Sequence, residues 1–329
     1  MATIFDVAAR AGVGVGTVSR VLNRSPLVSD STRTKVLAVI EDLDYRPSSL
    51  ARGLSLGRTN TIGIAVPFFT SPSAVQRMRG FASVLAGTDY QFMVLNVEDQ
   101  QQRTSALRAV AGDQVDGAVV VSLIPTEEEL QRLHPGRTVF IDVRVPGYSS
   151  VYSDDRAGGE MATHHLLELG HRRIAFVGDS EAEGISSPSA RRRRGYQDAL
   201  QQAGFERLPS LTRLGTPGRR SARDLTDAIL ADGDRPTAVF AACDTQALGV
   251  IEAARNHGLA IPDDLSVIGF DDIEMAAHVG LTTIRQPLEA SGQRAARILL
   301  DLLGESSIEP QHEIQELELK QRETTGVAR

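Results

Sequence analysis

The chain has 329 residues, 41% of them hydrophobic and 23% charged, a composition typical of a soluble globular protein with two or three domains. It has no run of about 18 apolar residues, no secretion signal at its start and a single cysteine, Cys243, so we expect a cytoplasmic protein without a membrane span or an internal disulfide. The net charge of −7 is unevenly divided: residues 1–60 hold eight Lys/Arg and five Asp/Glu, a net charge of +3, and only this part is suited to a polyanion such as nucleic acid.

The first 23 residues predict two short helices joined by a glycine-bearing turn. Thr3 is expected to cap the first helix, with Asp6 in its first turn. The turn is residues 12–14, and the second helix runs through about Asn23. Apolar residues at helical spacing face inward: Ile4, Val7, Ala8, Ala11, Val18, Val21 and Leu22. This arrangement is typical of the helix-turn-helix motif, whose second helix lies in the major groove of DNA.

The start of that second helix is where we expect base contacts. Val15 and Gly16 lie at its start, and Arg20 lies one turn later on the same face. An Arg fork matches O6 and N7 of guanine, and Val15 suits a thymine methyl. Short polar side chains suited to phosphate oxygens are also present: Thr17, Ser19 and Asn23. The alternative is a small helical hairpin that only caps a larger domain.

A third helix and a linker follow. Ser29 predicts the N-cap of a helix from about Asp30 to Leu43 that ends before Pro47. Its expected inner stripe closes a three-helix core: Val36, Leu37, Val39, Ile40 and Leu43. Residues 48–57 are rich in Ser and Gly, as a plain linker would be.

Residues 3–8, 11–13 and 17–23 closely resemble the headpiece of the lactose/galactose repressor (LacI/GalR) family. The resemblance implies that the linker holds a hinge helix, ordered on operator binding, with Leu54 as an apolar wedge in the minor groove. The family usually has larger polar side chains at position 15 or 16. Because Gly16 has no side chain, Arg20 must carry more of the base reading.

From Thr61 onward, strands rich in Val and Ile alternate with helices. The predicted strands are 61–66, 91–96, 117–121, 139–142, 173–177, 237–241 and 266–270, and the predicted helices are 78–86, 102–111, 157–169, 191–203 and 245–256. Such a pattern predicts parallel sheets covered on both faces. Residues 61–329 exceed one ordinary core, so we expect two Rossmann-like lobes beside an all-α headpiece.

This part resembles the effector domain of the same family, which is similar to periplasmic sugar-binding proteins, most clearly in residues 170–176, 266–272 and 281–287. The resemblance implies that the chain crosses between lobes three times. The expected division is a headpiece of 1–46, a hinge helix or linker of 47–60, an N-lobe of about 61–157 and 286–312, and a C-lobe of about 158–285 and 313–329.

Polar residues at strand ends predict a ligand cleft between the lobes. Asp154, Asp244 and Asp271 follow predicted strands, where ligands of parallel sheets bind, although each alone could be a helix N-cap or turn former. The resemblance makes Arg192 a ligand-gripping residue. It also places Ser73 in a cleft loop that lacks the family's aromatic wall. A sugar or sugar phosphate is the expected effector.

The sequence thus predicts a homodimeric regulator of transcription, a repressor by its family resemblance, whose affinity for a near-palindromic operator depends on a sugar-like effector. We expect no cofactor, metal or membrane partner and no enzymatic activity, because the sequence has no Gly-x-Ser-x-Gly, phosphate loop or metal-ligand cluster. The alternative is the solute-binding protein of a transporter, which would need an export signal and would leave the headpiece without a purpose.

Overall fold

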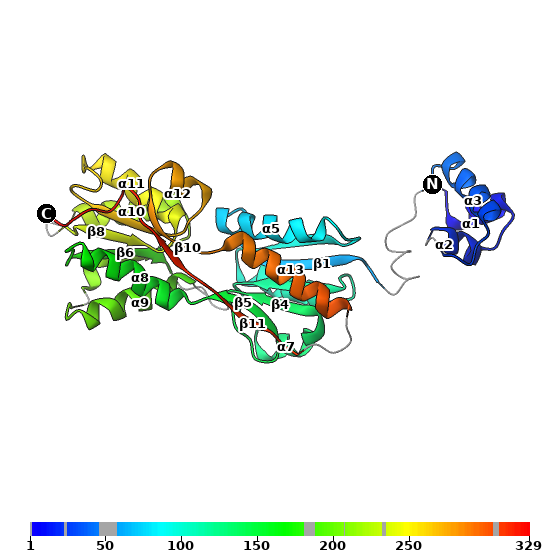
Figure 1. Cartoon of the computed structure of the whole chain (residues 1–329), viewed down its shortest axis with the longest axis horizontal. Coiled ribbons are helices and arrows are strands. Elements are labelled where there is room, and N and C mark those ends of the chain that lie inside the picture. The colour runs from blue at the N-terminus through cyan, green and yellow to red at the C-terminus, as the bar shows by residue number, and fades with distance from the viewer. Residues whose placement is uncertain are drawn as a thin grey trace. The chain divides into compact units, whose positions relative to one another are not determined.

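The computed structural model describes residues 2–22, 25–45, 58–180, 188–206, 208–231, 235–304 and 309–329. The chain separates into two compact units, residues 1–60 and 61–329 (Figure 1). Two predicted DNA contacts, Asn23 and Leu54, and the hinge helix of residues 48–57 lie outside the described residues. Within the described ranges, no helix combines the length and the apolar character that a bilayer crossing requires.

The headpiece consists of three helices, α1 (Ile4–Ala11), α2 (Val15–Leu22) and α3 (Asp30–Asp42). The predicted N-caps are confirmed: the Thr3 side chain accepts a hydrogen bond from the Asp6 backbone N–H, and that of Ser29 accepts one from Thr32. Buried apolar residues from all three helices and the segment between α2 and α3 form the core: Val7, Ala8, Ala11, Val18, Val21, Val28 and Val36.

One residue of the predicted α3 stripe was placed wrongly. Leu37 is 49% exposed, whereas its neighbour Val36 is fully buried. Val36, Ile40 and Leu43 recur at helical spacing and share one face, so a residue one position away from Val36 is turned toward solvent.

The first lobe is built on a six-stranded parallel sheet in the order β11-β5-β4-β3-β1-β2. Its strands are β1 (Thr61–Pro67), β2 (Gln91–Val97), β3 (Gly117–Val121), β4 (Thr138–Ile141), β5 (Ser149–Ser153) and β11 (His312–Gln315). Helices α5 (Pro72–Leu85) and α13 (Leu288–Gly304) pack on one face, and α6 (Gln100–Ala111) and α7 (Glu127–Arg132) on the other.

The second lobe has the sheet order β12-β10-β9-β8-β6-β7, in which only β12 is antiparallel to its neighbour. Its strands are β6 (Ile174–Asp179), β7 (Thr212–Gly215), β8 (Ala238–Ala241), β9 (Ser266–Asp271), β10 (Thr282–Arg285) and β12 (Glu318–Lys320). Helices α8 (Asp155–Glu168) and α9 (Pro188–Gln202) cover one face; α10 (Arg219–Ala231), α11 (Asp244–Asn256) and α12 (Glu274–His278) cover the other. The predicted fold class, a helical headpiece with two α/β lobes, is confirmed.

The chain passes between the two sheets three times, from β5 to α8, from β10 to α13 and from β11 to β12 (Figure 1). The last crossing follows Gln315, three residues later than the implied boundary, because β11 pairs with β5 of the first sheet along its whole length. The first follows Ser153, because α8 packs on the second lobe.

Helices α8 and α9 approach closely through two glycines. A Cβ atom on Gly195 would lie 2.0 Å from the Arg156 carbonyl oxygen, and one on Gly159 would lie 2.2 Å from the Arg192 carbonyl oxygen. Both distances are far below van der Waals contact, so only glycine fits. This contact holds the start of α9 against α8.

We therefore predict that Gly195→Ala lowers the free energy of unfolding of residues 61–329 by about 1–3 kcal/mol through overpacking. Urea unfolding followed by far-UV circular dichroism measures it, since the chain has no tryptophan. Gly87→Ala is the matched control, because a Cβ there has no neighbour within 4 Å, and it should change stability by less than about 0.5 kcal/mol. Equal effects of the two substitutions would contradict the close-packing argument.

Candidate DNA-binding and effector sites

Helix α2 presents one exposed face. Gly16 and Arg20 are exposed and lie four residues apart, so they share that face, while Val18 and Val21 are buried in the headpiece core. Three more predicted DNA contacts on this helix are half-buried: Val15, Thr17 and Ser19. Because Gly16 adds no side chain, Arg20 is the long side chain that this face offers to a partner.

In the second unit, seven polar side chains form a closed ring of contacts at the junction of the two lobes. This polar ring consists of Arg77, Asp142, Asp155, Arg191, Arg192, Asp271 and Gln286. Most of its members follow the carboxyl ends of strands or lie in the first turns of helices, where ligands of parallel sheets bind.

Arg192 is the centre of the second-lobe half of the ring. Its Nε donates to Asp155 Oδ1 at 2.9 Å and its Nη1 to the Ala242 carbonyl at 2.7 Å, while Nη1 lies 3.4 Å from Asp271 Oδ1. The guanidinium carbon lies 3.7 Å from the ring centroid of Phe270, a cation–π distance. With 5% of its surface exposed, Arg192 depends on these partners to offset its desolvation.

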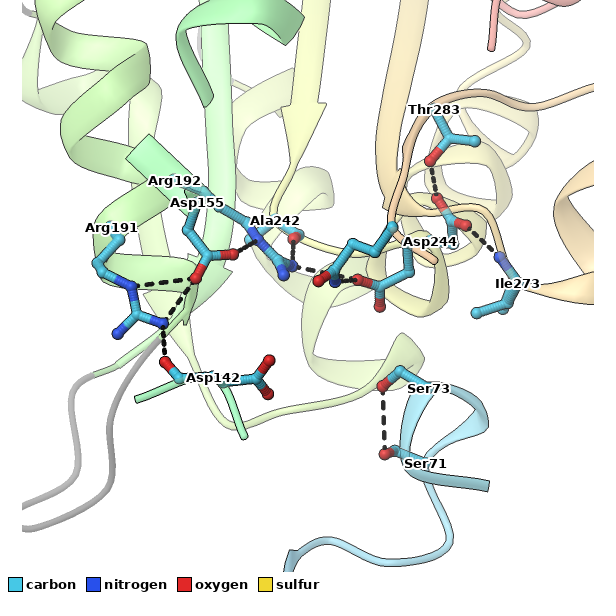
Figure 2. A network of polar contacts seen from close by, with 12 residues as sticks. Ser71, Ser73, Asp142, Asp155, Arg191, Arg192, Ala242, Asp244, Ile273 and Thr283 are labelled. Carbon is cyan, nitrogen blue, oxygen red and sulfur yellow. Dashed lines mark hydrogen bonds and ion pairs between the residues drawn. The ribbon is translucent and has the colours of Figure 1, made fainter. Parts of the chain in front are cut away.

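Asp155 holds two arginines at once. Its Oδ2 accepts from Arg191 Nε at 3.0 Å and from Arg191 Nη2 at 2.6 Å, while its Oδ1 accepts from Arg192. Figure 2 shows Asp155 between the two guanidinium groups, with Asp142 beyond Arg191. The Arg191 Nη2 also donates to the Asp142 carbonyl at 3.1 Å and so links the second lobe to the first.

The first-lobe half closes the ring. Arg77 Nη2 donates to Asp142 Oδ1 at 2.7 Å and to Gln286 Oε1 at 3.3 Å, and Gln286 Nε2 donates to Asp271 Oδ1 at 2.6 Å. Burial raises the pKa of the Asp271 carboxyl, against the opposing charges of Arg192 and Arg77. The ring therefore couples both lobes and the β10–α13 crossing in one set of charged contacts.

Backbone strain is concentrated at the same strand ends. Ser122, Asp142 and Asp271 have φ angles of 49°, 66° and 117°, in the region that favours glycine. Each follows or ends a strand of one of the two sheets, and the Ser122 hydroxyl donates to Asp142 Oδ2 at 2.7 Å. Strain of this kind persists where surrounding contacts hold it and is frequent at ligand sites.

A second polar pair, the buried Gln246 and the half-buried Asp179, lies beside the ring. Gln246 Nε2 donates to Asp179 Oδ1 at 2.6 Å, and burial raises the pKa of Asp179 to about 6, with the charge of Arg192 opposing the shift. Burial likewise raises the pKa of the Cys243 thiol, and the neighbouring charge of Asp271 adds to the shift.

The structure joins two of the predicted effector residues, Arg192 and Asp271, in the polar ring, and leaves three outside it. Asp154 is exposed, and its Oδ1 accepts from the N–H groups of Arg156 and Ala157 at the start of α8, which is the N-cap role left open above. Ser73 lies in the first turn of α5, with its hydroxyl 3.5 Å from that of Ser71 and apart from the arginines (Figure 2).

Asp244 has an internal role. It is fully buried, and its carboxylate accepts from the Thr283 hydroxyl at 2.6 Å and from the Ile273 N–H at 2.9 Å. These bonds tie the start of α11 to β10 and to the loop before α12. Burial, followed by the nearby charge of Asp271, raises the pKa of Asp244 to about 8.

That shift predicts a pH dependence of stability. Below about pH 4 the carboxyl of Asp244 is protonated in both states; between about pH 4 and 8 the unfolded chain loses the proton that the folded chain retains, so stability falls as pH rises. Asp244→Asn stays neutral and can bond both partners, since the Thr283 hydroxyl can also accept. The variant should gain stability relative to the parent by up to about 1.4 kcal/mol per pH unit from pH 5 to 8.

Urea unfolding at several pH values measures this difference. The control is Asp263→Asn, which makes the same substitution at an exposed carboxylate that pairs with Arg329. A pH-independent difference for Asp244→Asn would contradict the raised pKa.

Several residues of the ring could not be recognised from the sequence: Arg77, Asp142, Asp155, Arg191 and Gln286. The only signal for Asp155 and Arg191 is that each lies next to a residue that the sequence did predict, Asp154 and Arg192. Arg77 and Asp142 acquire their roles only from the way the lobes fold together.

The comparisons with known proteins agree with this arrangement. The lacI family of bacterial regulatory proteins matches residues 3–48, and the periplasmic binding protein-like domain matches residues 163–325. The ribose operon repressor of Escherichia coli (strain K12) is 34% identical over 319 residues, which cover 94% of this chain and 96% of the repressor.

Two solved structures are similar over almost the whole chain. The transcriptional regulator CelR–cellobiose complex has 31% identity and a TM-score of 0.71, and covers 98% of this chain and 100% of its own. The Lac repressor dimer bound to operator and the anti-inducer ONPF has 27% identity and a TM-score of 0.80, with 99% of each chain covered. A transporter's solute-binding protein would not account for the match at residues 3–48, and this chain belongs to the lacI family of bacterial regulatory proteins.

Proposed function

We propose that this chain is a transcriptional repressor that binds a near-palindromic operator as a homodimer and changes its operator affinity when a small sugar-like effector binds at the polar ring. The observation that carries the proposal is the pairing, in one chain, of a helix-turn-helix unit with a charged ring that joins two lobes. A ligand at such a junction alters operator affinity only if it binds one lobe arrangement more tightly than the other.

The DNA contacts follow from the exposed face of α2. Arg20 reads a guanine, and Val15 and Gly16 allow the helix to approach the groove closely. Phosphate contacts that set the register come from the short polar side chains already named: Thr17, Ser19 and Asn23. Leu54 acts as the minor-groove wedge of the hinge.

A homodimer supplies the affinity that one headpiece lacks. The charge of +3 on residues 1–60 gives weak phosphate attraction, and two linked headpieces gain effective concentration. Both lobes expose apolar side chains that a second copy would cover: Val75, Phe92, Met275 and Val279 are each 37–48% exposed. The Lac repressor relative is itself a dimer on its operator.

The effector contacts are assigned to both lobes. Arg192 and Asp271 grip the ligand from the second lobe, and Ser73 contacts it from the first. Asp154 and Asp244 support the site at the starts of α8 and α11. The cellobiose bound to the CelR relative supports a sugar-like ligand.

The test is selection of binding sites from a random duplex library by the full chain, followed by gel shifts of the selected site with and without a panel of sugars. We expect an inverted-repeat site and a change in apparent affinity with at least one sugar. Selection of no preferred sequence at moderate salt would refute DNA-binding function, whereas a preferred site that no small molecule affects would refute only the effector role.

A further inference from the structure

We propose that the polar ring selects an uncharged polyhydroxyl effector and rejects its phosphorylated counterpart. This inference rests on the proposed function and specifies the ligand class of the same site. It follows from the charge balance of the ring and from the hydrogen-bonding groups beside it.

Every arginine of the ring already has a carboxylate partner. Arg77 pairs with Asp142 at 2.7 Å, and both Arg191 and Arg192 pair with Asp155, at 2.6 and 2.9 Å. Three arginines stand against three aspartates, because Asp271 adds a third carboxylate 3.4 Å from Arg192. The ring is therefore neutral as it stands, and a dianionic phosphate would add uncompensated charge to a buried site.

The surroundings add negative charge. Asp179 lies close enough to Arg192 and Asp271 for the charges of both to act on it. A phosphate would thus meet four carboxylates (Asp142, Asp155, Asp179 and Asp271) against three arginines, in a setting where charges are poorly screened. A hydroxyl group adds no charge and replaces hydrogen bonds one for one.

One buried acceptor near the ring also favours hydroxyl groups. Gln246 is 1% exposed, its Nε2 donates to Asp179, and its Oε1 has no hydrogen-bond partner among the described residues. Arg77 Nε, in the ring itself, is the other buried polar atom without a partner among the described residues. A ligand hydroxyl can donate to the Gln246 oxygen and accept from Arg77 Nε, while a phosphate dianion has only acceptors. Buried acceptors without partners are costly, so a donor from the ligand would be stabilising here.

Asp155 is the residue on which the selectivity depends. Its single carboxylate pairs with two arginines in the first half of α9, Arg191 and Arg192. Asp155→Asn keeps the shape of the side chain but leaves Arg191 and Arg192 with one fewer negative charge. Two adjacent guanidinium groups are a good phosphate site, so the variant should acquire anion binding that the parent lacks.

The first experiment measures binding of matched pairs to the full chain by calorimetry and thermal shift, for example ribose with ribose 5-phosphate and glucose with glucose 6-phosphate, together with glucosamine as a cationic probe. We expect the neutral member of any pair that binds to be tighter by about tenfold or more. Tighter binding of a phosphate or of the amino sugar to the parent would overturn the proposal.

The second experiment needs no knowledge of the effector. Melting temperature is followed with increasing inorganic phosphate at constant ionic strength, for the parent, Asp155→Asn and the control Asp198→Asn, which removes a carboxylate that pairs with Arg156 on the surface of α8 and α9. Stabilisation by phosphate should appear only in Asp155→Asn. If that variant does not fold, Asp142→Asn, which frees Arg77 from its carboxylate partner, takes its place.

The outcomes separate the two proposals. Equal phosphate effects on all proteins, or none on the ring variants, would overturn the charge argument even if neutral sugars bind. Neutral sugars that bind without altering operator affinity would refute the proposed effector role and leave the ligand class standing.

Discussion

Alanine in place of Arg192 should lower the free energy of unfolding of residues 61–329 by about 3–5 kcal/mol, the largest stability effect that we expect from a single substitution in the chain. The substitution leaves Asp155 and Asp271 buried without their shared cation, and it removes the donor to the Ala242 carbonyl and the cation stacked on Phe270. The cost comes mainly from buried charges left unpaired, not from the value of the ion pair itself.

Urea unfolding followed by circular dichroism measures this effect. The matched control is Arg156→Ala, which removes an exposed arginine paired with Asp198 on the same helix pair and should cost less than about 1 kcal/mol. Arg192→Lys should fall between the two, because an ammonium keeps the charge but cannot reach Asp155, Asp271 and the Ala242 carbonyl with one planar fork. A loss for Arg192→Ala no larger than that for Arg156→Ala would show that the ring contributes little.

The alternation of strands and helices was legible in the sequence because buried parallel strands read as continuous Val/Ile runs. Four helices of the second unit were nevertheless missed, the short α7 and α12 and the longer α10 and α13. The inward residues of the longer two recur at helical spacing, such as Ala222, Thr226 and Ile229 in α10. In α13, small residues on the inward face make the apolar pattern harder to recognise. One of them is Gly292, where a Cβ atom would lie 2.0 Å from the Arg77 carbonyl oxygen of α5.

The site was harder to predict than the fold. Asp154 and Asp155 are adjacent and chemically identical, yet one caps α8 in solvent and the other is 4% exposed between two arginines. Which carboxylate turns inward depends on where the helix begins, and boundaries are the least certain part of a sequence-based prediction. Arg77 and Asp142 lie 65 positions apart and meet only through the tertiary fold.

The proposed selectivity of the ring rests on its charge, as the proposed DNA binding of the headpiece rests on the charge of residues 1–60. Residues 61–329 are acidic and the arginines of the ring are paired, so this unit does not attract a phosphate backbone. The headpiece is cationic and its Arg20 is exposed, so it does attract one. If both proposals hold, the two units carry out opposite tasks, anion binding in one and anion rejection in the other.

Arg20→Ala should weaken binding to the selected operator by about 1–3 kcal/mol for each headpiece, so by about 2–6 kcal/mol for a dimer that uses two copies. Its side chain is the long one on the exposed face of α2, and Gly16 offers no second base contact on that face. Gel-shift titration against the operator and against its versions with one altered base pair measures both affinity and preference. Circular dichroism checks the fold, which should be unaffected because Arg20 lies outside the headpiece core.

Arg20→Lys is the informative control for this prediction, because it keeps the positive charge and therefore the salt-dependent attraction to phosphates. Lysine has no bidentate fork, so it should lose preference at one base pair in each half-site while its binding to random duplex stays close to that of the parent. If instead Arg20→Ala lowered binding to operator and to random duplex by the same factor, Arg20 would be a phosphate contact and base reading would have to come from elsewhere on α2.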